Sequence, residues 1–141
     1  MADTITCAYF AGLFDGEGCV AMYLGKRGNS RYVVTVSNTD RRPLEKAISI
    51  WGGSLTCQKA AGRKYAKADV LRWHLYGRNA VQFLQDIMPY TTIKTEQIQL
   101  YLEAMKLISN KSGWFRTTDE SKTLAGFVGE IAQLKRANQY V

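Results

Sequence analysis

Two carboxylates stand between glycines at the end of an apolar stretch near the N-terminus. Asp15 and Glu17 alternate with Gly16 and Gly18 directly after residues 8–14, which have the apolar spacing of a helix. Carboxylates are disfavoured at the C-terminal end of a helix, because the exposed carbonyl groups and the helix dipole are negative there. A hard divalent cation offsets this cost, since Mg²⁺ binds carboxylate, carbonyl and water oxygens. The alternative is that both acids cap turns or pair with surface lysines.

Few other side chains offer a different chemistry. His74 is the only histidine, so a Ser-His-Asp or Cys-His set would depend on it alone, and a strand histidine is the simpler interpretation. Cys7, Cys19 and Cys57 are odd in number, far apart and without a CxxC pair. This pattern favours thiols in a reducing compartment over disulfides or zinc ligands.

The net charge of +7 is confined to two stretches of the chain. Residues 18–39 and 47–68 together carry seven basic side chains and no acid, whereas basic and acidic residues balance elsewhere. The seven are Lys26, Arg27, Arg31, Lys59, Arg63, Lys64 and Lys67. Charge concentrated in this way predicts a surface for a polyanion. A pair of solvated loops is the alternative.

Periodicity and turn residues predict the elements that position these groups. Helices are expected over residues 4–14, 43–51, 78–88, 94–108 and 119–137, and hairpins over 19–38 and 55–75. We therefore predict one α+β domain over residues 1–141, with its core at about 4–110, in which helices back a four-stranded antiparallel sheet. Each basic stretch is then a hairpin with its charge at the tip. No signal peptide or membrane-spanning segment is predicted, so an intracellular protein is expected.

The predicted sheet has one apolar face for the helices and one polar face. The polar face carries Tyr23, Arg27, Thr35, Gln58, Arg72 and His74. Because an antiparallel sheet packs its core on one side only, the polar face is the expected binding groove.

Small residues form a stripe along the first predicted helix. Ala8 and Gly12 lie four residues apart with Ala11 beside them, and such a stripe lets two helix backbones approach closely. The stretch "TLAGFVGEI" at residues 123–131 looks similar, but it lacks the Asp and the glycine-acid-glycine step. We therefore predict an amphipathic surface helix there, without a second acidic site.

The stretch "FAGLFDGEG" at residues 10–18 resembles the signature of the LAGLIDADG homing endonucleases. Further similar pieces follow in the family's order over roughly residues 8–110. They are "VSNTDRRPLEK", "IWGG", "RWHLYGRNAVQFLQDIMPY" and the lysine of "TTIK". The resemblance is to single-motif members and implies the αββαββα fold, a saddle-shaped sheet over double-stranded DNA, and a homodimer whose motif helices pack at the twofold axis.

The resemblance also implies roles for individual residues. Glu17 would hold the catalytic metal with the carbonyl of Gly16, while Asp15 would be structural at the helix pair. Lys94, Asn38 and Arg41 would complete the active site, with Ser37 and Arg42 as the alternatives for the last two. The dimer interface would contain Ala8, Ala11, Gly12 and Asp15. DNA contacts are expected from Tyr23, Lys26, Arg27, Arg31, Thr35, Gln58, Lys59, Arg63, Lys64, Lys67, Arg72 and His74.

The sequence departs from the family signature at two positions. Glu17 stands where Asp is commoner, and Phe14 replaces an aliphatic residue. Neither change removes an oxygen ligand, so the predicted function is a site-specific, Mg²⁺-dependent double-strand DNA endonuclease, intron-encoded and located with its host genome. Mn²⁺ or Ca²⁺ would suit the same ligands. The alternative is a nuclease-inactive relative that binds intron RNA as a maturase or DNA as a regulator. Retention of Glu17 and Lys94 favours the enzyme.

Overall fold

Helix α1 (Thr4–Glu17) begins the chain and leads directly into strand β1 (Gly18–Tyr23). The carboxylate of Asp3 caps α1 by accepting a hydrogen bond from the amide of Thr6 at 2.7 Å. The helix continues through Gly16 to Glu17, so the predicted end at residue 14 is wrong. A glycine weakens a helix interior by only about 1 kcal/mol, which tertiary contacts outweigh here.

The computed structural model describes residues 2–25, 30–60, 68–108 and 118–139. The remaining strands are β2 (Arg31–Asn38), β3 (Ser54–Gln58) and β4 (Val70–Tyr76). The remaining α-helices are α2 (Arg41–Trp51), α3 (Val81–Ile87), α4 (Thr95–Ile108) and α5 (Thr118–Gln139), and two 3₁₀ turns are η2 (Gly77–Ala80) and η3 (Met88–Tyr90). The order of elements follows the prediction.

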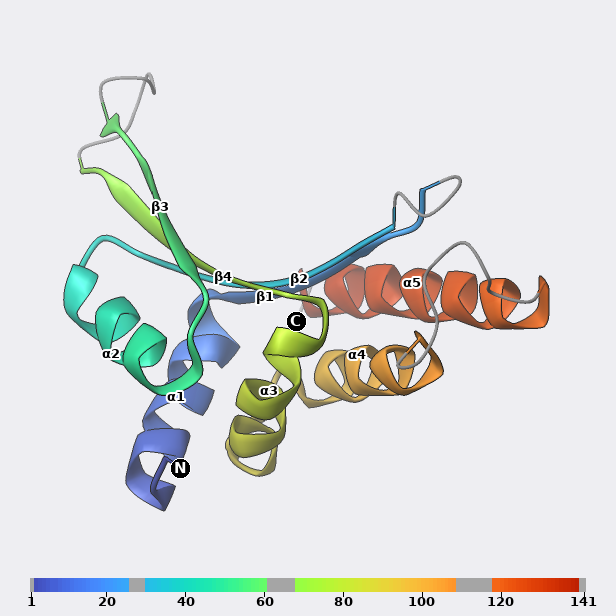
Figure 1. Cartoon of the computed structure of the whole chain (residues 1–141), viewed down its shortest axis with the longest axis horizontal. Coiled ribbons are helices and arrows are strands. Elements are labelled where there is room, and N and C mark those ends of the chain that lie inside the picture. Colours follow the sequence, from blue (N-terminus) through green and yellow to red (C-terminus); the bar gives the residue numbers. More distant parts are fainter. Residues whose placement is uncertain (1, 26–29, 61–67, 109–117, 140–141) are drawn as a thin grey trace.

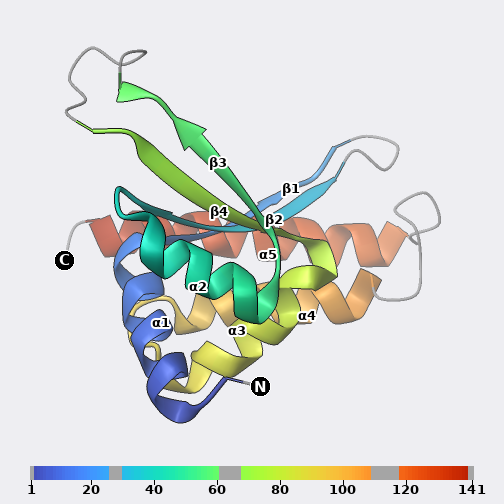
Figure 2. The ribbon, with the colours of Figure 1, turned by 60° about the vertical axis from the view of Figure 1, so that its left-hand side comes forward.

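The four strands form one antiparallel sheet in the order β1-β2-β4-β3. Figure 1 shows this sheet curving upwards at both ends, with the helices beneath it, so that its free face is concave. The predicted α+β class and the saddle shape are confirmed. Figure 2 shows α5 lying across the back of the sheet beside β1, which it contacts.

Alternating residues of the strands separate the two faces of the sheet. Val34 and Val36 of β2, and Trp73 and Leu75 of β4, are almost fully buried against the helices. The residues between them belong to the concave face, as a period of two requires. The core therefore lies wholly on the helical side.

An aromatic cluster joins the helices to this buried face. Trp51 packs edge-on against Phe10 and Phe83, with ring centroids 5.2 and 4.8 Å apart. The indole N–H of Trp73 donates to the carbonyl of Gly52 at 2.8 Å. The backbone at Gly53 passes close to this indole, and a Cβ at residue 53 would lie 2.6 Å from the Trp73 Nε1 atom. Its φ of 98° also favours glycine.

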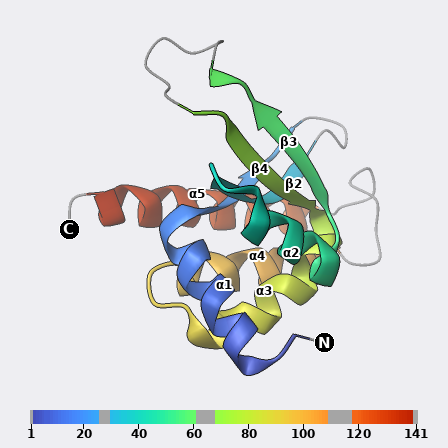
Figure 3. The ribbon, with the colours of Figure 1, turned by 90° about the vertical axis from the view of Figure 1, so that its left-hand side faces the viewer.

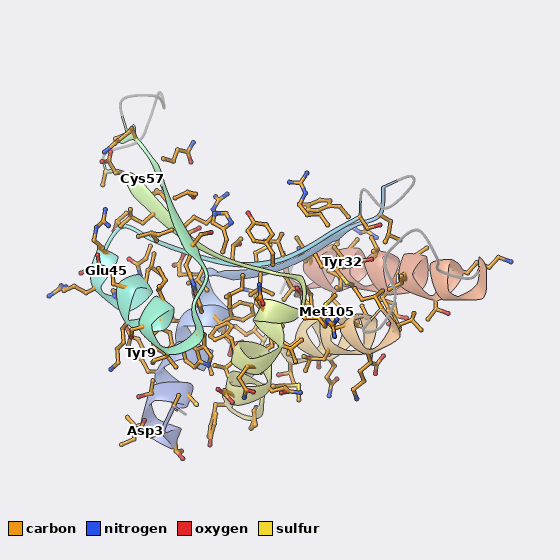
Figure 4. All side chains as sticks on the ribbon, viewed as in Figure 1. Asp3, Tyr9, Tyr32, Glu45, Cys57 and Met105 are labelled. Carbon is orange, nitrogen blue, oxygen red and sulfur yellow. The ribbon has the colours of Figure 1, made fainter. Side chains whose placement is uncertain are left out.

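Helix α5 also contributes to the core. Leu124 and Ile131 are buried in the same cluster as the strand residues, so this helix is amphipathic, as predicted, and packs its apolar side against α4 and β1. None of the described helices has the length and apolar content that a bilayer crossing requires. Figure 4 shows the side chains on the ribbon. Tyr9 lies on the helical side of the sheet, and Cys57 lies near the outer end of β3.

Candidate active site

Glu17 is the last residue of α1, and its side chain is exposed. It makes no hydrogen bond or ion pair within the described part of the chain. A Cβ added at the next residue, Gly18, would overlap the ring of Phe14, so the chain turns from helix to strand where only glycine fits. This turn leaves the Glu17 carboxylate open at the end of the concave groove.

The concave groove joins Glu17 to the polar face of the sheet. Its lining comprises Glu17, Cys19, Ala21, Tyr23, Arg31, Val33, Thr35, Ser37, Arg72, His74 and Tyr76. Five of these, Tyr23, Arg31, Thr35, Arg72 and His74, were predicted to contact DNA. The structure therefore brings the predicted metal ligand and much of the predicted DNA surface into one groove.

Contacts across the strands order the polar side chains of this groove. The guanidinium of Arg72 donates through Nε to the hydroxyl of Ser37 at 3.2 Å. The Nε2 atom of His74 lies 2.9 Å from the hydroxyl of Thr56 on β3, and its ring stacks on Tyr76 at 5.8 Å. Burial lowers the pKa of His74, and the nearby Arg72 charge acts in the same direction.

Tyr76 lines the groove but was not singled out in the sequence, although a signal for it was present. It follows His74 by two residues, so strand alternation places it on the polar face. Alternation places Ser37, the predicted alternative to Asn38, on the same face, because it follows Thr35 by two residues. At the opposite end of the groove, the Arg31 guanidinium lies over the Tyr23 ring, 5.8 Å from its centroid.

The remaining predicted DNA contacts lie away from this groove lining or outside the described chain. Gln58 is exposed at the end of β3, in register with Val70. The ammonium of Lys59 pairs with Asp69 at 3.5 Å. Lys26, Arg27, Arg63, Lys64 and Lys67 lie outside the described residues.

Asp15 and Lys94 join the end of α1 to the segment just before α4. The Asp15 carboxylate accepts hydrogen bonds from the backbone amides of Thr92, Ile93 and Lys94, at 2.7 to 3.1 Å, just before α4. In return, the Lys94 ammonium donates to the carbonyls of Phe14 and Asp15, each at 3.0 Å, in the last turn of α1. Asp15 therefore caps a turn within its own chain, and its part in a dimer interface remains a prediction.

Lys94 is half-buried behind the end of α1. Desolvation lowers its pKa, although the charges of Cys19, Asp15 and Glu17 oppose that shift. Electrostatic interaction with Glu17 supports the prediction that Lys94 belongs to the same site. Its donor atoms, however, serve the α1 carbonyls in this structure.

Of the other predicted active-site residues, Asn38 and its alternative Ser37 lie near Glu17. Ser37 and Asn38 both line a second hollow with Glu17, together with Thr39 and Val70. The Asn38 side chain also accepts from the amide of Asp40 at 2.9 Å, which shapes the turn into α2.

The two candidate arginines are engaged elsewhere. Arg41 pairs with Glu45 at 3.5 Å, and Arg42 pairs with Asp40 at 2.6 Å. Neither lines the two hollows that contain Glu17. In the single chain, the structure does not bring them to the predicted site.

The ligands for a metal ion in one chain are few. No group of three His, Cys, Asp or Glu side chains gathers at one point among the described residues. The exposed Glu17 carboxylate and the carbonyl of Gly16, in the last helical turn, are oxygen donors of the kind that Mg²⁺ prefers. Their chemistry fits the predicted ion, with further ligands needed from a partner, DNA or water.

One side of α1 is open. Figure 3 shows this helix at the front of the helical layer, where Ile5 and Tyr9 are 82% and 55% exposed. Ala8 and Gly12 are exposed on the same helix, and a Cβ at Gly12 would meet no atom within 4 Å. Ala11 is fully buried in the chain's own core, so placing it in the dimer interface was wrong.

Several solved structures that are similar to this chain share one architecture. The homing endonuclease I-CvuI, in complex with its target in the presence of Ca, is 21% identical with a TM-score of 0.67, over 92% of this chain and 82% of that one. The archaeal intron-encoded homing endonuclease I-Vdi141I, complexed with DNA, is 17% identical with a TM-score of 0.71, over 92% and 84%. This chain has the fold of the LAGLIDADG homing endonucleases.

The LAGLIDADG fold predicted from the sequence is thereby confirmed. The match to I-SmaMI, bound to uncleaveable DNA, is 18% identical with a TM-score of 0.68, and it covers 92% of this chain but only 45% of the I-SmaMI chain. No protein-family model matches the sequence, and no curated protein sequence matches it.

Proposed function

We propose that this protein is a site-specific double-strand DNA endonuclease that uses a divalent metal ion and acts as a homodimer. The observation that carries the proposal is the exposed Glu17 carboxylate at the end of a concave, polar groove, with Lys94 behind the same helix end. I-CvuI and I-Vdi141I, which share this fold, were solved in complex with DNA. A DNA duplex is therefore the polyanion that suits this groove.

In this proposal, different residues of the chain have different roles in hydrolysis. Glu17 and the carbonyl of Gly16 would hold the ion, which when bound would activate water and neutralise charge on the phosphate. Lys94 adds positive charge near the site and keeps the last turn of α1 in place. Ser37 and Asn38, which line a hollow with Glu17, are close enough to contribute polar groups. A histidine base is unnecessary in this scheme.

A homodimer would supply one such site for each DNA strand. The open side of α1 offers exposed apolar side chains at Ile5 and Tyr9, with small residues at Ala8 and Gly12 that allow a second helix to approach. Ile93, 51% exposed, lies beside this helix, because its amide is bonded to Asp15. An apolar patch of this kind is typical of a protein interface.

The dimensions of the strands are consistent with a long target. The longest strand, β2, has 8 residues and at about 3.3 Å per residue spans about 26 Å, which matches about eight base pairs along a duplex. Two subunits would therefore cover on the order of sixteen base pairs with a pseudo-palindromic sequence. The groove side chains Tyr23, Arg72 and His74 would read base edges, and basic residues at its margins would bind phosphates.

Cleavage of host DNA tests this function. Purified protein is incubated with genomic DNA from a host strain that lacks this reading frame, in Mg²⁺ or in EDTA, and the new DNA ends are sequenced. We expect one double-strand break per genome copy in Mg²⁺ and none in EDTA, at the site where an intron carrying the frame would insert. Tight binding to intron RNA without any cleavage in Mg²⁺ would favour the maturase instead.

A further inference from the structure

The buried side of α5 ends at the edge of β1. Leu124 and Ile131 are buried in the core, and Lys135 follows Ile131 by four residues on the same side of the helix. Lys135 is half-buried. Its ammonium donates to the carbonyl of Val20 at 2.7 Å and lies 3.5 Å from the sulfur of Cys19. A side chain from the last helix is thus tied to the first residues of β1.

Two lysines bracket Glu17 along the backbone. Lys94 holds two carbonyls in the last turn of α1, just before Glu17, and Lys135 holds a carbonyl three residues after it. Glu17 itself makes no hydrogen bond within the described residues. The backbone on both sides of Glu17 is therefore anchored, while its carboxylate is open to the groove.

Lys135 meets the strand edge with a hydrogen-bond donor. Its half-buried ammonium has a carbonyl and a thiol as partners, and neither neutralises its charge. This charge also lies near Lys94, whose pKa is lowered first by burial and further by Lys135. An apolar side chain at residue 135 would continue the stripe of Leu124 and Ile131, but it could not donate to the Val20 carbonyl. The directed hydrogen bond indicates that Lys135 holds β1 in addition to packing beside it.

We propose that Lys135 is a positioning residue for Glu17 in DNA cleavage. By holding the start of β1, it fixes the junction between α1 and β1 and thereby keeps the Glu17 carboxylate at the end of the groove. Lys135 acts through the backbone carbonyl of Val20 and the side chain of Cys19. This inference rests on the proposed endonuclease function, and it adds to the site a group from α5, a helix outside the αββαββα core.

The test compares Lys135→Met with Lys135→Arg and with a control, Lys122→Met. Lys122 lies on the same helix with an exposed side chain, so its replacement removes an equal charge without touching β1. Amide hydrogen exchange at residues 17–21 is measured first, together with the melting temperature. Cleavage rate in Mg²⁺ and binding affinity in Ca²⁺ are then measured on the duplex mapped with host DNA.

In Lys135→Met we expect exchange at residues 17–21 to accelerate about tenfold, because the junction opens more often. The cleavage rate should fall about 10- to 100-fold, as expected for a displaced catalytic group, with DNA affinity unchanged. Lys135→Arg should restore most of the rate, and Lys122→Met should behave as the wild type. A rescue by arginine at an unchanged melting temperature would distinguish positioning from general stability.

Three results would overturn the inference. They are a wild-type cleavage rate in Lys135→Met, unchanged exchange at residues 17–21, and a loss of DNA affinity in proportion to the loss of rate, which would make Lys135 a phosphate contact. If the wild type cuts no DNA at all, the endonuclease proposal fails, and the role of Lys135 in cleavage fails with it. Exchange would then still show whether this lysine anchors the junction.

Discussion

The two edge strands of the sheet, β1 and β3, differ in how they are held. In β1, Val20, Ala21 and Met22 are buried, and Lys135 of α5 bonds to the edge carbonyl of Val20. Covering an edge in this way prevents it from pairing with another chain and limits local opening. The strand that follows Glu17 is thus the firmly anchored one.

Strand β3 lies at the opposite edge and is mostly open to solvent. Four of its five residues, Ser54, Thr56, Cys57 and Gln58, are exposed. Its contacts are chiefly with β4, including the bond between Thr56 and His74. The difference indicates that the end of the groove at Glu17 is held more firmly than β3.

Replacing Glu17 with Gln should have the largest effect. The amide keeps the shape of the side chain but removes the charge that holds the metal ion, so cleavage should fall by at least about 10³-fold, or roughly 4 kcal/mol. DNA binding, measured in Ca²⁺ by gel shift, should be retained. Gln58→Ala on β3 is the comparison, and it should alter affinity while leaving the cleavage rate of bound DNA intact. Full cleavage by the Glu17→Gln protein would refute the metal assignment.

A matched pair of truncations compares the stability of the two edges. Met22→Ala in β1 should cost about 2–5 kcal/mol, because it leaves a cavity in the core. Cys57→Ala in β3 should change stability by no more than about 0.5 kcal/mol, since that side chain is exposed. Urea unfolding gives both values. Equal losses at the two positions would contradict the proposed difference between the edges.

Gly12→Leu tests whether the open side of α1 forms the dimer interface. A Cβ there would meet no atom of another part of the chain within 4 Å, and residue 12 is exposed, so the monomer should fold normally. In the dimer the added side chain would wedge the helix pair, at a cost of about 1–3 kcal/mol, or roughly 5- to 150-fold in the dissociation constant. Sedimentation velocity measures the change. A mass and dissociation constant equal to those of the wild type would argue against this interface.

The smallest effect is expected from replacing His74, a residue of β4 whose ring is bonded to Thr56 of β3. Its pKa is below 6.5, because burial and Arg72 disfavour the charged ring. The unfolded chain therefore binds more protons as the pH falls below about 6.5, so His74 lowers stability progressively on acidification through its folded pKa. His74→Gln should flatten this dependence, as measured by melting temperature between about pH 7.5 and 5. If the melting temperature of His74→Gln depends on pH as steeply as that of the wild type, His74 does not make the stability pH-dependent.

Strand alternation made the groove predictable. The polar residues at Thr35, Arg72 and His74 were placed on one face from a period of two, and the structure lines one groove with them. Gly18 likewise marked the end of the first helix, whereas Gly16 lies inside it. These signals are local, because they depend on residues within a few positions of each other.

Other features escaped prediction because they depend on distant parts of the chain. The end of α1 was placed too early, since the carbonyls of its last turn are stabilised by Lys94, almost eighty residues away. Ala11 was placed on the open stripe, although α1 is covered on that side by its own core. A small residue looks the same in the sequence whether it faces a neighbouring helix of its own chain or of a partner.

The sequence by itself determined the alternation of elements, the two faces of the sheet and the position of an acid beside glycines near the end of the first helix, because short-range periodicity and backbone preference encode them. Only the tertiary structure decided what holds the backbone around that acid. Asp15 and Lys94 join the end of α1 to the segment before α4, and Lys135 reaches β1 from the last helix, through contacts that span 77 to 116 positions in the chain. Such pairings arise from packing in three dimensions, which no local pattern records.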